Sequence, residues 1–374
     1  MRRLLLVIVL AILYGSFYPW HFAYNPGNFF LVPVSSSNLQ DLILNFWLYV
    51  PAGACGYWVF ARAGALRWIL PVCLGLALSL CVELVQYFIP TRLSSQGDIL
   101  ANTMGTAAGM LVAALVGYAP ELSRWRLRRS PETLLLGCWL AFLGFPFFPV
   151  HGLWSLMANV RKFQGSSFLW SDMIVFTIAW VVVWQFLPAT FVRDTYWLAA
   201  GSLLLLLPAR FFLILRVLTK SEVVAGAAAL CLAPLLRRMA VPPWVTAALV
   251  LIALMIRGLA PFELSAFASP FNWIPFSGFL GSDWQSATLV LFAKLFWYGT
   301  AVWAIRRCGL ALGLSGVVVA LLLAGIEIIQ RHMPAHVPEI TDPLLALGCA
   351  AAFGLVSRIP IGAPADGTYA LQHR

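Results

Sequence analysis

The chain has 374 residues, of which 61% are hydrophobic and only 10% are charged, and its mean hydropathy is +0.88. Because about half of the residues in a soluble domain are apolar, this composition excludes a soluble globular protein and predicts an all-α polytopic membrane protein. The formal net charge of +10 would suit a nucleic-acid-binding surface only on a soluble fold, so we predict no nucleic-acid partner. The arginines stand in short segments between apolar runs, where they act as topology signals.

Apolar runs of about 20 residues, the length that a bilayer requires, recur along the whole chain. The first run follows two arginines as in a signal peptide, but no small-residue cleavage site comes after it, so we expect a membrane helix. We predict about twelve transmembrane helices, at residues 3–19, 41–61, 68–89, 98–118, 132–150, 172–190, 195–215, 221–236, 242–260, 286–305, 309–331 and 341–357.

Basic residues predict the orientation of these spans. They cluster in alternate connections, at Arg62 and Arg67, 124–129, Arg193, Arg237 and Arg238, Arg306 and Arg307, and Arg358. All of these clusters fall on one side of the membrane if both termini are cytoplasmic, and an even number of spans agrees with that orientation. The loops that hold Arg92, Arg216 and His336 then face outward, as do the aromatic-rich segments 20–40, 151–171 and 261–285. We expect these segments to lie at the interface as short helices or re-entrant pieces.

Residues 83–109 hold an unusual density of polar side chains for a region that joins two membrane spans. The same residue types return near the end of the chain at the same intervals: Glu83, Gln86, Pro90 and Asp98 match Glu327, Gln330, Pro334 and Asp342. A weaker copy has Arg216 followed six residues later by Glu222. We therefore predict three four-helix repeats, residues 1–119, 132–240 and 242–358, followed by a cytoplasmic tail at 359–374.

Ionisable and amide side chains near membrane depth are candidates for function. Glu83 and Gln86 share one helix face by their spacing, as do Asp98 and Asn102 on the next helix. Arg92, in the connection, can reach either carboxylate. The candidate ligand-binding residues are the polar side chains of the first and third repeats: Asp41, Asn45, Glu83, Gln86, Arg92, Asp98, Asn102, Glu327, Gln330, His336 and Asp342.

A purely structural interpretation of the same residues stays open. A Glu–Arg–Asp network, with Asn102 bonding between helices, would hold a hairpin together in lipid without any ligand. Gly105 and Gly109 continue the face of Asp98 and predict close approach of another helix. The middle repeat has Leu207 and Arg210 in place of the glutamate and glutamine, which indicates that the first repeat is the working copy.

No pattern of residues indicates a metal or a cofactor. The seven cysteines are singly spaced in or beside apolar runs, without a CxxC pair, and are expected to be buried thiols. His332 and His336 are four residues apart, but Pro334 between them breaks the helical geometry of a metal pair. We predict neither a metal site nor a cofactor.

The motif from Glu83 through Gln86, Arg92, Asp98 and Asn102 to Gly109, with Asp41-x-x-x-Asn45 upstream, resembles the VanZ-like family. The resemblance is partial over the third repeat, and the middle repeat matches only at Asp172, Arg216 and Glu222. It implies an integral protein of the bacterial cytoplasmic membrane, in a family whose namesake is linked to low-level teicoplanin resistance. A typical member has one such unit rather than three.

Three functions follow as hypotheses. In the first, an outward-facing polar site binds or transports an envelope lipid, a lipid-linked saccharide or a glycopeptide. In the second, a membrane enzyme uses Glu83 or Asp98 as acid or base and Arg92 to hold an anionic headgroup. In the third, the protein is a structural or assembly component. The residues leave open whether the protein is an enzyme and which residues would be catalytic, and membrane lipids are the expected partners.

Overall fold

The computed structural model describes residues 1–24, 31–34, 39–118, 130–145, 150, 152–190, 201, 205–213, 218–238, 241–282 and 284–358. Contacts divide the chain into two compact parts, which we name the amino-terminal body, Met1–Trp125, and the carboxy-terminal body, Arg126–Arg374. Among the described residues, the regular secondary structure is helical, with two isolated β-bridges besides. The predicted tail at 359–374, Arg193, Arg216 and most of the predicted span 195–215 lie outside the described residues.

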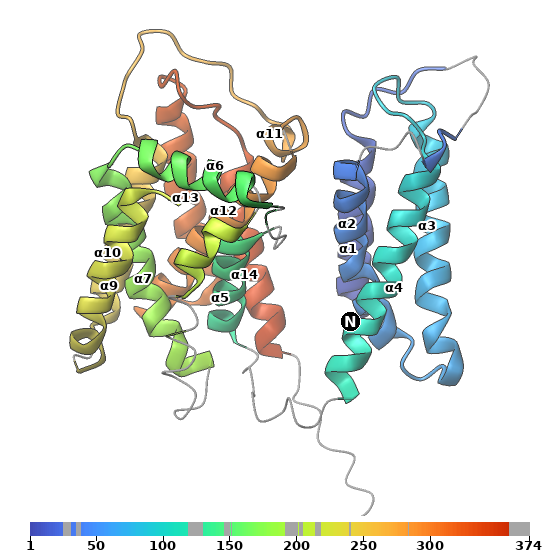
Figure 1. Ribbon diagram of the computed structural model, residues 1–374, viewed down its shortest axis with the longest axis horizontal. Coiled ribbons are helices and arrows are strands. Elements are labelled where there is room, and N and C mark those ends of the chain that lie inside the picture. The colour runs from blue at the N-terminus through green and yellow to red at the C-terminus, as the bar shows by residue number, and fades with distance from the viewer. Residues whose placement is uncertain are drawn as a thin grey trace, which may run out of the picture. The chain divides into compact units, whose positions relative to one another are not determined.

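The amino-terminal body consists of four long helices and a short 3-10 turn (Figure 1). They are α1 (Arg2–Phe17), α2 (Leu39–Val59), η2 (Gly64–Trp68), α3 (Leu70–Gln86) and α4 (Gln96–Tyr118). These bounds lie within a few residues of the first four predicted spans. The α3–α4 connection lies beside the segment after α1, because the Ala23 amide donates to the Phe88 carbonyl at 2.8 Å.

The carboxy-terminal body contains the remaining described elements. They are α5 (Pro131–Gly144), α6 (Gly152–Gly165), α7 (Trp170–Thr190), η5 (Arg210–Phe212), α9 (Lys220–Arg238), α10 (Pro243–Leu259), α11 (Ser277–Leu280), α12 (Trp284–Arg307), α13 (Leu312–Gln330) and α14 (Thr341–Arg358). Short helices were predicted within 151–171 and 261–285, and α6 and α11 confirm them as helices.

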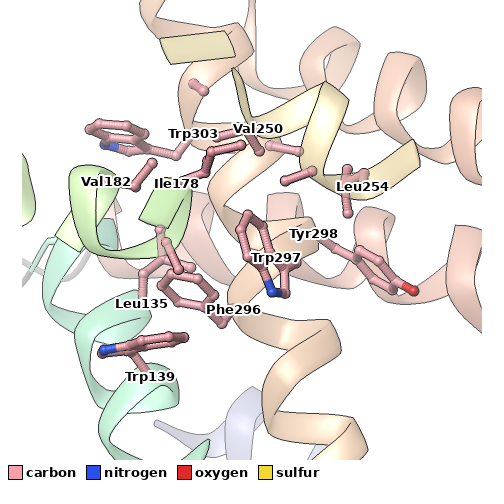
Figure 2. Packing of buried hydrophobic residues seen from close by; sticks show 14 of the residues in the cluster. Leu135, Trp139, Ile178, Val182, Val250, Leu254, Phe296, Trp297, Tyr298 and Trp303 are labelled. Atoms are coloured by element: carbon pink, nitrogen blue, oxygen red, sulfur yellow. The ribbon is translucent and has the colours of Figure 1, made fainter. Parts of the chain in front are cut away.

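A single aromatic-rich core joins the helices of the carboxy-terminal body (Figure 2). At its centre Trp139 of α5 packs on Phe296 of α12, with ring centroids 4.7 Å apart, and meets Trp180 of α7 edge to face. Leu254 of α10 belongs to the same core. Helix α12 therefore packs against helices of both the second and the third predicted repeat, and these two repeats share one hydrophobic core.

Several helices have the length and apolarity of membrane spans. Within the described residues, five are long enough to cross a bilayer: Asp41–Val59, Gln96–Leu115, Trp170–Thr190, Ser286–Arg307 and Leu312–Gln330. Four shorter apolar helices accompany them: Leu70–Gln86, Pro131–Gly144, Pro243–Leu259 and Thr341–Val356. Large apolar side chains such as Leu111 and Leu115 are exposed, as expected for surfaces that face lipid. The chain is a multi-pass helical membrane protein.

Helices α2 and α4 approach each other so closely that their backbones touch at glycines. A β-carbon added to Gly105 would lie 2.1 Å from the carbonyl oxygen of Phe46, and one on Gly109 would lie 1.9 Å from that of Val50. The contact is reciprocal, because a β-carbon added to Gly53 of α2 would lie 1.8 Å from the Thr106 carbonyl oxygen. The prediction that the Gly105–Gly109 strip contacts another helix is confirmed, and it places α2 directly against the polar start of α4.

Candidate functional site

Glu83, near the end of α3, fixes the connection between α3 and α4. Its side chain is only 2% exposed, and its Oε2 accepts a hydrogen bond from the Ser95 backbone amide at 2.8 Å. The Ser94 hydroxyl donates to the Glu83 carbonyl at 2.8 Å. A buried carboxylate needs such donors to offset its lost hydration. Glu83 therefore holds the start of α4 against the end of α3.

Two of the three candidate amides of the first predicted repeat, Gln86 and Asn102, bond to neighbouring helices. Gln86 Nε2 donates to the Ser16 carbonyl of α1 at 3.0 Å. Asn102 Nδ2 of α4 donates to the Ser79 hydroxyl of α3 at 2.9 Å. Bonds of this kind join helices where no water competes for the polar groups. Gln86 and Asn102 thus support the site from beneath.

Asp98 opens toward the surface at the start of α4. Its side chain is half-buried and hydrogen-bonded to Asn45 of α2, and it lies within electrostatic range of the exposed Asp41 and of Glu83. The structure thus brings four predicted residues of the first repeat together from three helices. The result is an acidic corner that combines a buried carboxylate with two accessible ones.

Arg92, which we expected to be within reach of Glu83 and Asp98, is exposed in the α3–α4 connection. Its Nε instead donates to the Tyr18 carbonyl at 3.4 Å, and the ion pairs of the described residues do not include it. It acts on Asp98 only as a nearby positive charge. The guanidinium therefore remains accessible at the rim of the acidic corner.

The carboxy-terminal body contains the same set of side-chain bonds. Glu327 Oε2 accepts from the Glu339 amide at 2.7 Å, as Glu83 does from Ser95. Gln330 Nε2 donates to the Gly258 carbonyl at 2.7 Å, as Gln86 Nε2 does to the Ser16 carbonyl. His336 Nε2 contacts the Ala260 carbonyl at 2.7 Å, at the position where Arg92 Nε donates to the Tyr18 carbonyl.

The backbone around these side chains matches as well. A parallel bridge joins Val32 to Ser95, and an equivalent bridge joins Asn272 to Glu339. The Val32 amide donates to the Ser94 carbonyl at 2.9 Å, and the Val32 carbonyl accepts from the Gln96 amide at 3.0 Å. Asn272 makes the same two bonds, to Pro338 and from Ile340, at the same distances. Because side-chain and backbone bonds match at these positions, the corner around Glu83 can be compared residue by residue with the one around Glu327.

The corner of the carboxy-terminal body has a lysine at its centre. Lys294 Nζ of α12 lies 2.5 Å from Asp342 Oδ1 and 3.2 Å from Glu339 Oε1. The Tyr298 hydroxyl donates to Asp342 Oδ2. The side chains of Asp342 and Glu327 are also hydrogen-bonded to each other. Lys294, Glu339 and Tyr298 are not among the candidate residues predicted from the sequence. Lys294 and Tyr298 are four residues apart, so both lie on one face of α12.

The middle repeat holds a buried ion pair instead of an accessible corner. Arg210 Nη1 lies 2.7 Å from Glu222 Oε1, and the two side chains are only 3% and 5% exposed. Glu222 Oε2 also accepts from the Thr219 amide at 2.8 Å. Sequence reasoning drew attention to Arg216 here, whereas Arg210 makes the bond to Glu222. This pair is closed to ligands.

The described residues hold no group of three His, Cys, Asp or Glu side chains arranged to bind a metal ion.

Comparison with known proteins gives a match to the amino-terminal part of the chain. The VanZ/LLP1 family model matches residues 3–117, which confirms the resemblance over the first predicted repeat. No match was found among curated proteins or solved structures.

Proposed function

Because the VanZ/LLP1 family model matches residues 3–117, we propose that the chain is a VanZ-like protein of the bacterial cytoplasmic membrane whose amino-terminal body binds a polar headgroup. The ligand is an envelope lipid, a lipid-linked saccharide or a glycopeptide. The observation that carries the proposal is the accessible corner of Asp41, Asp98 and Arg92, which rests on the buried Glu83. Charges of both signs at the end of a helical membrane bundle suit a headgroup at the interface.

The guanidinium of Arg92 is the group suited to an anionic part of the ligand. Arginine presents several donors in a planar fork that matches phosphate or carboxylate oxygens. Within the site, Glu83 Oε2, Gln86 Nε2 and Asn102 Nδ2 are committed to bonds within the protein. Arg92 contacts only a carbonyl at 3.4 Å and is exposed, so a ligand can reach it.

We also propose that the chain comprises three repeats of four spans, with both termini in the cytoplasm. The matched bonds of Glu83 with Glu327 and of Gln86 with Gln330 support the repeats. The alternate placement of arginine clusters supports the orientation, which turns the corner of the amino-terminal body outward. The buried Arg210–Glu222 pair makes the middle repeat a scaffold.

Arg92→Ala is expected to weaken ligand binding about tenfold or more, since charge-assisted hydrogen bonds to an anion are lost. The melting temperature should change little, because Arg92 is exposed and outside the helices. Native mass spectrometry of the full chain with an extract of bacterial envelope lipids measures the bound species and their relative affinities.

The matched control is Arg331→Ala, which removes another exposed arginine whose Nε donates to a backbone carbonyl, that of Ser269 at 3.3 Å. It should leave the bound species unchanged. Equal losses from the two variants, with both proteins folded, would contradict a site at the amino-terminal corner. A lower melting temperature for Arg92→Ala with unchanged binding would show that the network is structural.

A further inference from the structure

Asn45 of α2 and Lys294 of α12 occupy equivalent positions in the two corners. The next residue in each helix turns its carbonyl toward the partner helix. The Leu295 carbonyl accepts from Cys349 Sγ of α14, and the Phe46 carbonyl lies against Gly105 of α4. Asn45 bonds to Asp98 as Lys294 bonds to Asp342. A tyrosine follows each after four residues, Tyr49 and Tyr298.

The two corners differ in their built-in positive charge. In the carboxy-terminal body the Lys294 ammonium lies between Glu339 and Asp342, and Arg257 adds a second attraction to Asp342. In the amino-terminal body an uncharged amide stands in place of the ammonium, and residues 1–119 contain no lysine at all. Asp98 consequently lacks the ammonium that bonds its counterpart Asp342, and the positive charge near it is that of Arg92.

A second observation shows that the amino-terminal corner lacks a hydrogen-bond donor. Asn102 is 2% exposed, and its Oδ1 has no hydrogen-bond partner although its Nδ2 bonds Ser79. A buried acceptor without a partner is destabilising. The equivalent residue of the other corner is Ala346, which is fully buried and has no polar side chain to satisfy. Asn102 stands one helical turn after Asp98, on the same face of α4.

Building on the proposed function, we infer that the ligand of the amino-terminal body carries a primary ammonium group, which takes the place that the Lys294 ammonium has in the other corner. Asp98 and Asp41 bind the ammonium, and Arg92 binds an anionic group of the same molecule. A headgroup with an ammonium and a phosphate a few bonds apart, of the phosphoethanolamine type, fits these charges. Lys294 thus supplies, from within the protein, the ammonium that the ligand supplies to the amino-terminal corner.

The test supplies the missing lysine. Asn45→Lys is expected to place an ammonium on Asp98 and to weaken binding of phosphatidylethanolamine by about tenfold or more. Leu66→Lys adds the same charge at an exposed position of η2, outside the corner, and should bind nearly as the parent chain does. The measurement is native mass spectrometry of the full chain with phosphatidylethanolamine or phosphatidylglycerol of the same acyl chains. Asp98→Asn, which changes no volume, should also weaken binding and serves if Asn45→Lys does not fold.

The outcomes separate this inference from the proposed function. Equal binding of both lipids, with no effect of Asn45→Lys or Asp98→Asn, would overturn the ammonium site and leave headgroup binding at Arg92 intact. If the parent chain binds neither lipid, both the ammonium site and the proposed headgroup binding are overturned. Competition by soluble phosphoethanolamine would show that the headgroup alone is recognised. Binding of the lipid without such competition would assign recognition to the whole lipid.

Discussion

Replacing Gly109 by leucine is expected to destabilise the amino-terminal body by roughly 3 kcal/mol or more, because the new side chain collides with backbone rather than with a movable side chain. The β-carbon alone would lie 1.9 Å from the Val50 carbonyl oxygen and 3.0 Å from the Ala54 nitrogen. Helices α2 and α4 would have to separate, and Asn45 would then move away from Asp98. Thermal unfolding in detergent, followed by the loss of monodisperse protein, measures the effect.

Gly137→Leu is the matched control for Gly109→Leu. Gly137 is also a helical glycine, but it is exposed, and a β-carbon there would meet no atom within 4 Å. Its melting temperature should be close to that of the parent chain. An unchanged melting profile for Gly109→Leu would mean that this face of α4 looks toward lipid and not toward α2.

Arg210→Met is expected to destabilise the carboxy-terminal body by about 3–5 kcal/mol, the usual effect of removing one partner from a buried ion pair. Glu222 would be left with the Thr219 amide and hydroxyl as donors but with no positive charge, at 5% side-chain exposure. Because a pair of matched neutral groups avoids the unpaired charge, the double variant Arg210→Met with Glu222→Gln should recover part of the loss. Melting temperatures of the four proteins form the double-mutant cycle.

Arg161→Met, at an exposed position of α6, is the control for loss of one arginine. It should leave stability nearly unchanged. Additive effects of Arg210→Met and Glu222→Gln, with no recovery in the double variant, would contradict the assignment of this pair as a coupled buried unit.

Hydrophobic length was enough to predict most of the helices, since a bilayer requires apolar segments of a set length. The polar faces were also accessible from the sequence: the four-residue spacing of Asp98 and Asn102 predicted one face of α4. The contact of Gly105 and Gly109 with another helix followed from the same spacing, because only glycine leaves room for a neighbouring backbone.

Pairing between side chains was less predictable, because it depends on which backbone groups a loop presents. Arg92 and Glu83 are nine residues apart, yet Arg92 contacts the Tyr18 carbonyl and Glu83 accepts from the Ser95 amide. Lys294 is distant in sequence from Asp342, and only the packing of α12 on α14 brings them together. Spacing within a helix predicts a shared face, whereas the partner of that face comes from tertiary packing.

The most direct test of headgroup binding is a density map of the full chain in nanodiscs of bacterial envelope lipid, with a bound antibody fragment to aid alignment. The expected result is ordered headgroup density in contact with Arg92 and Asp98, above the buried Glu83 and Asn102, which are 2% exposed. The same density should be absent from the corner that Lys294 fills. A map with lipid tails along the helices but no headgroup at Arg92 and Asp98 would contradict the account.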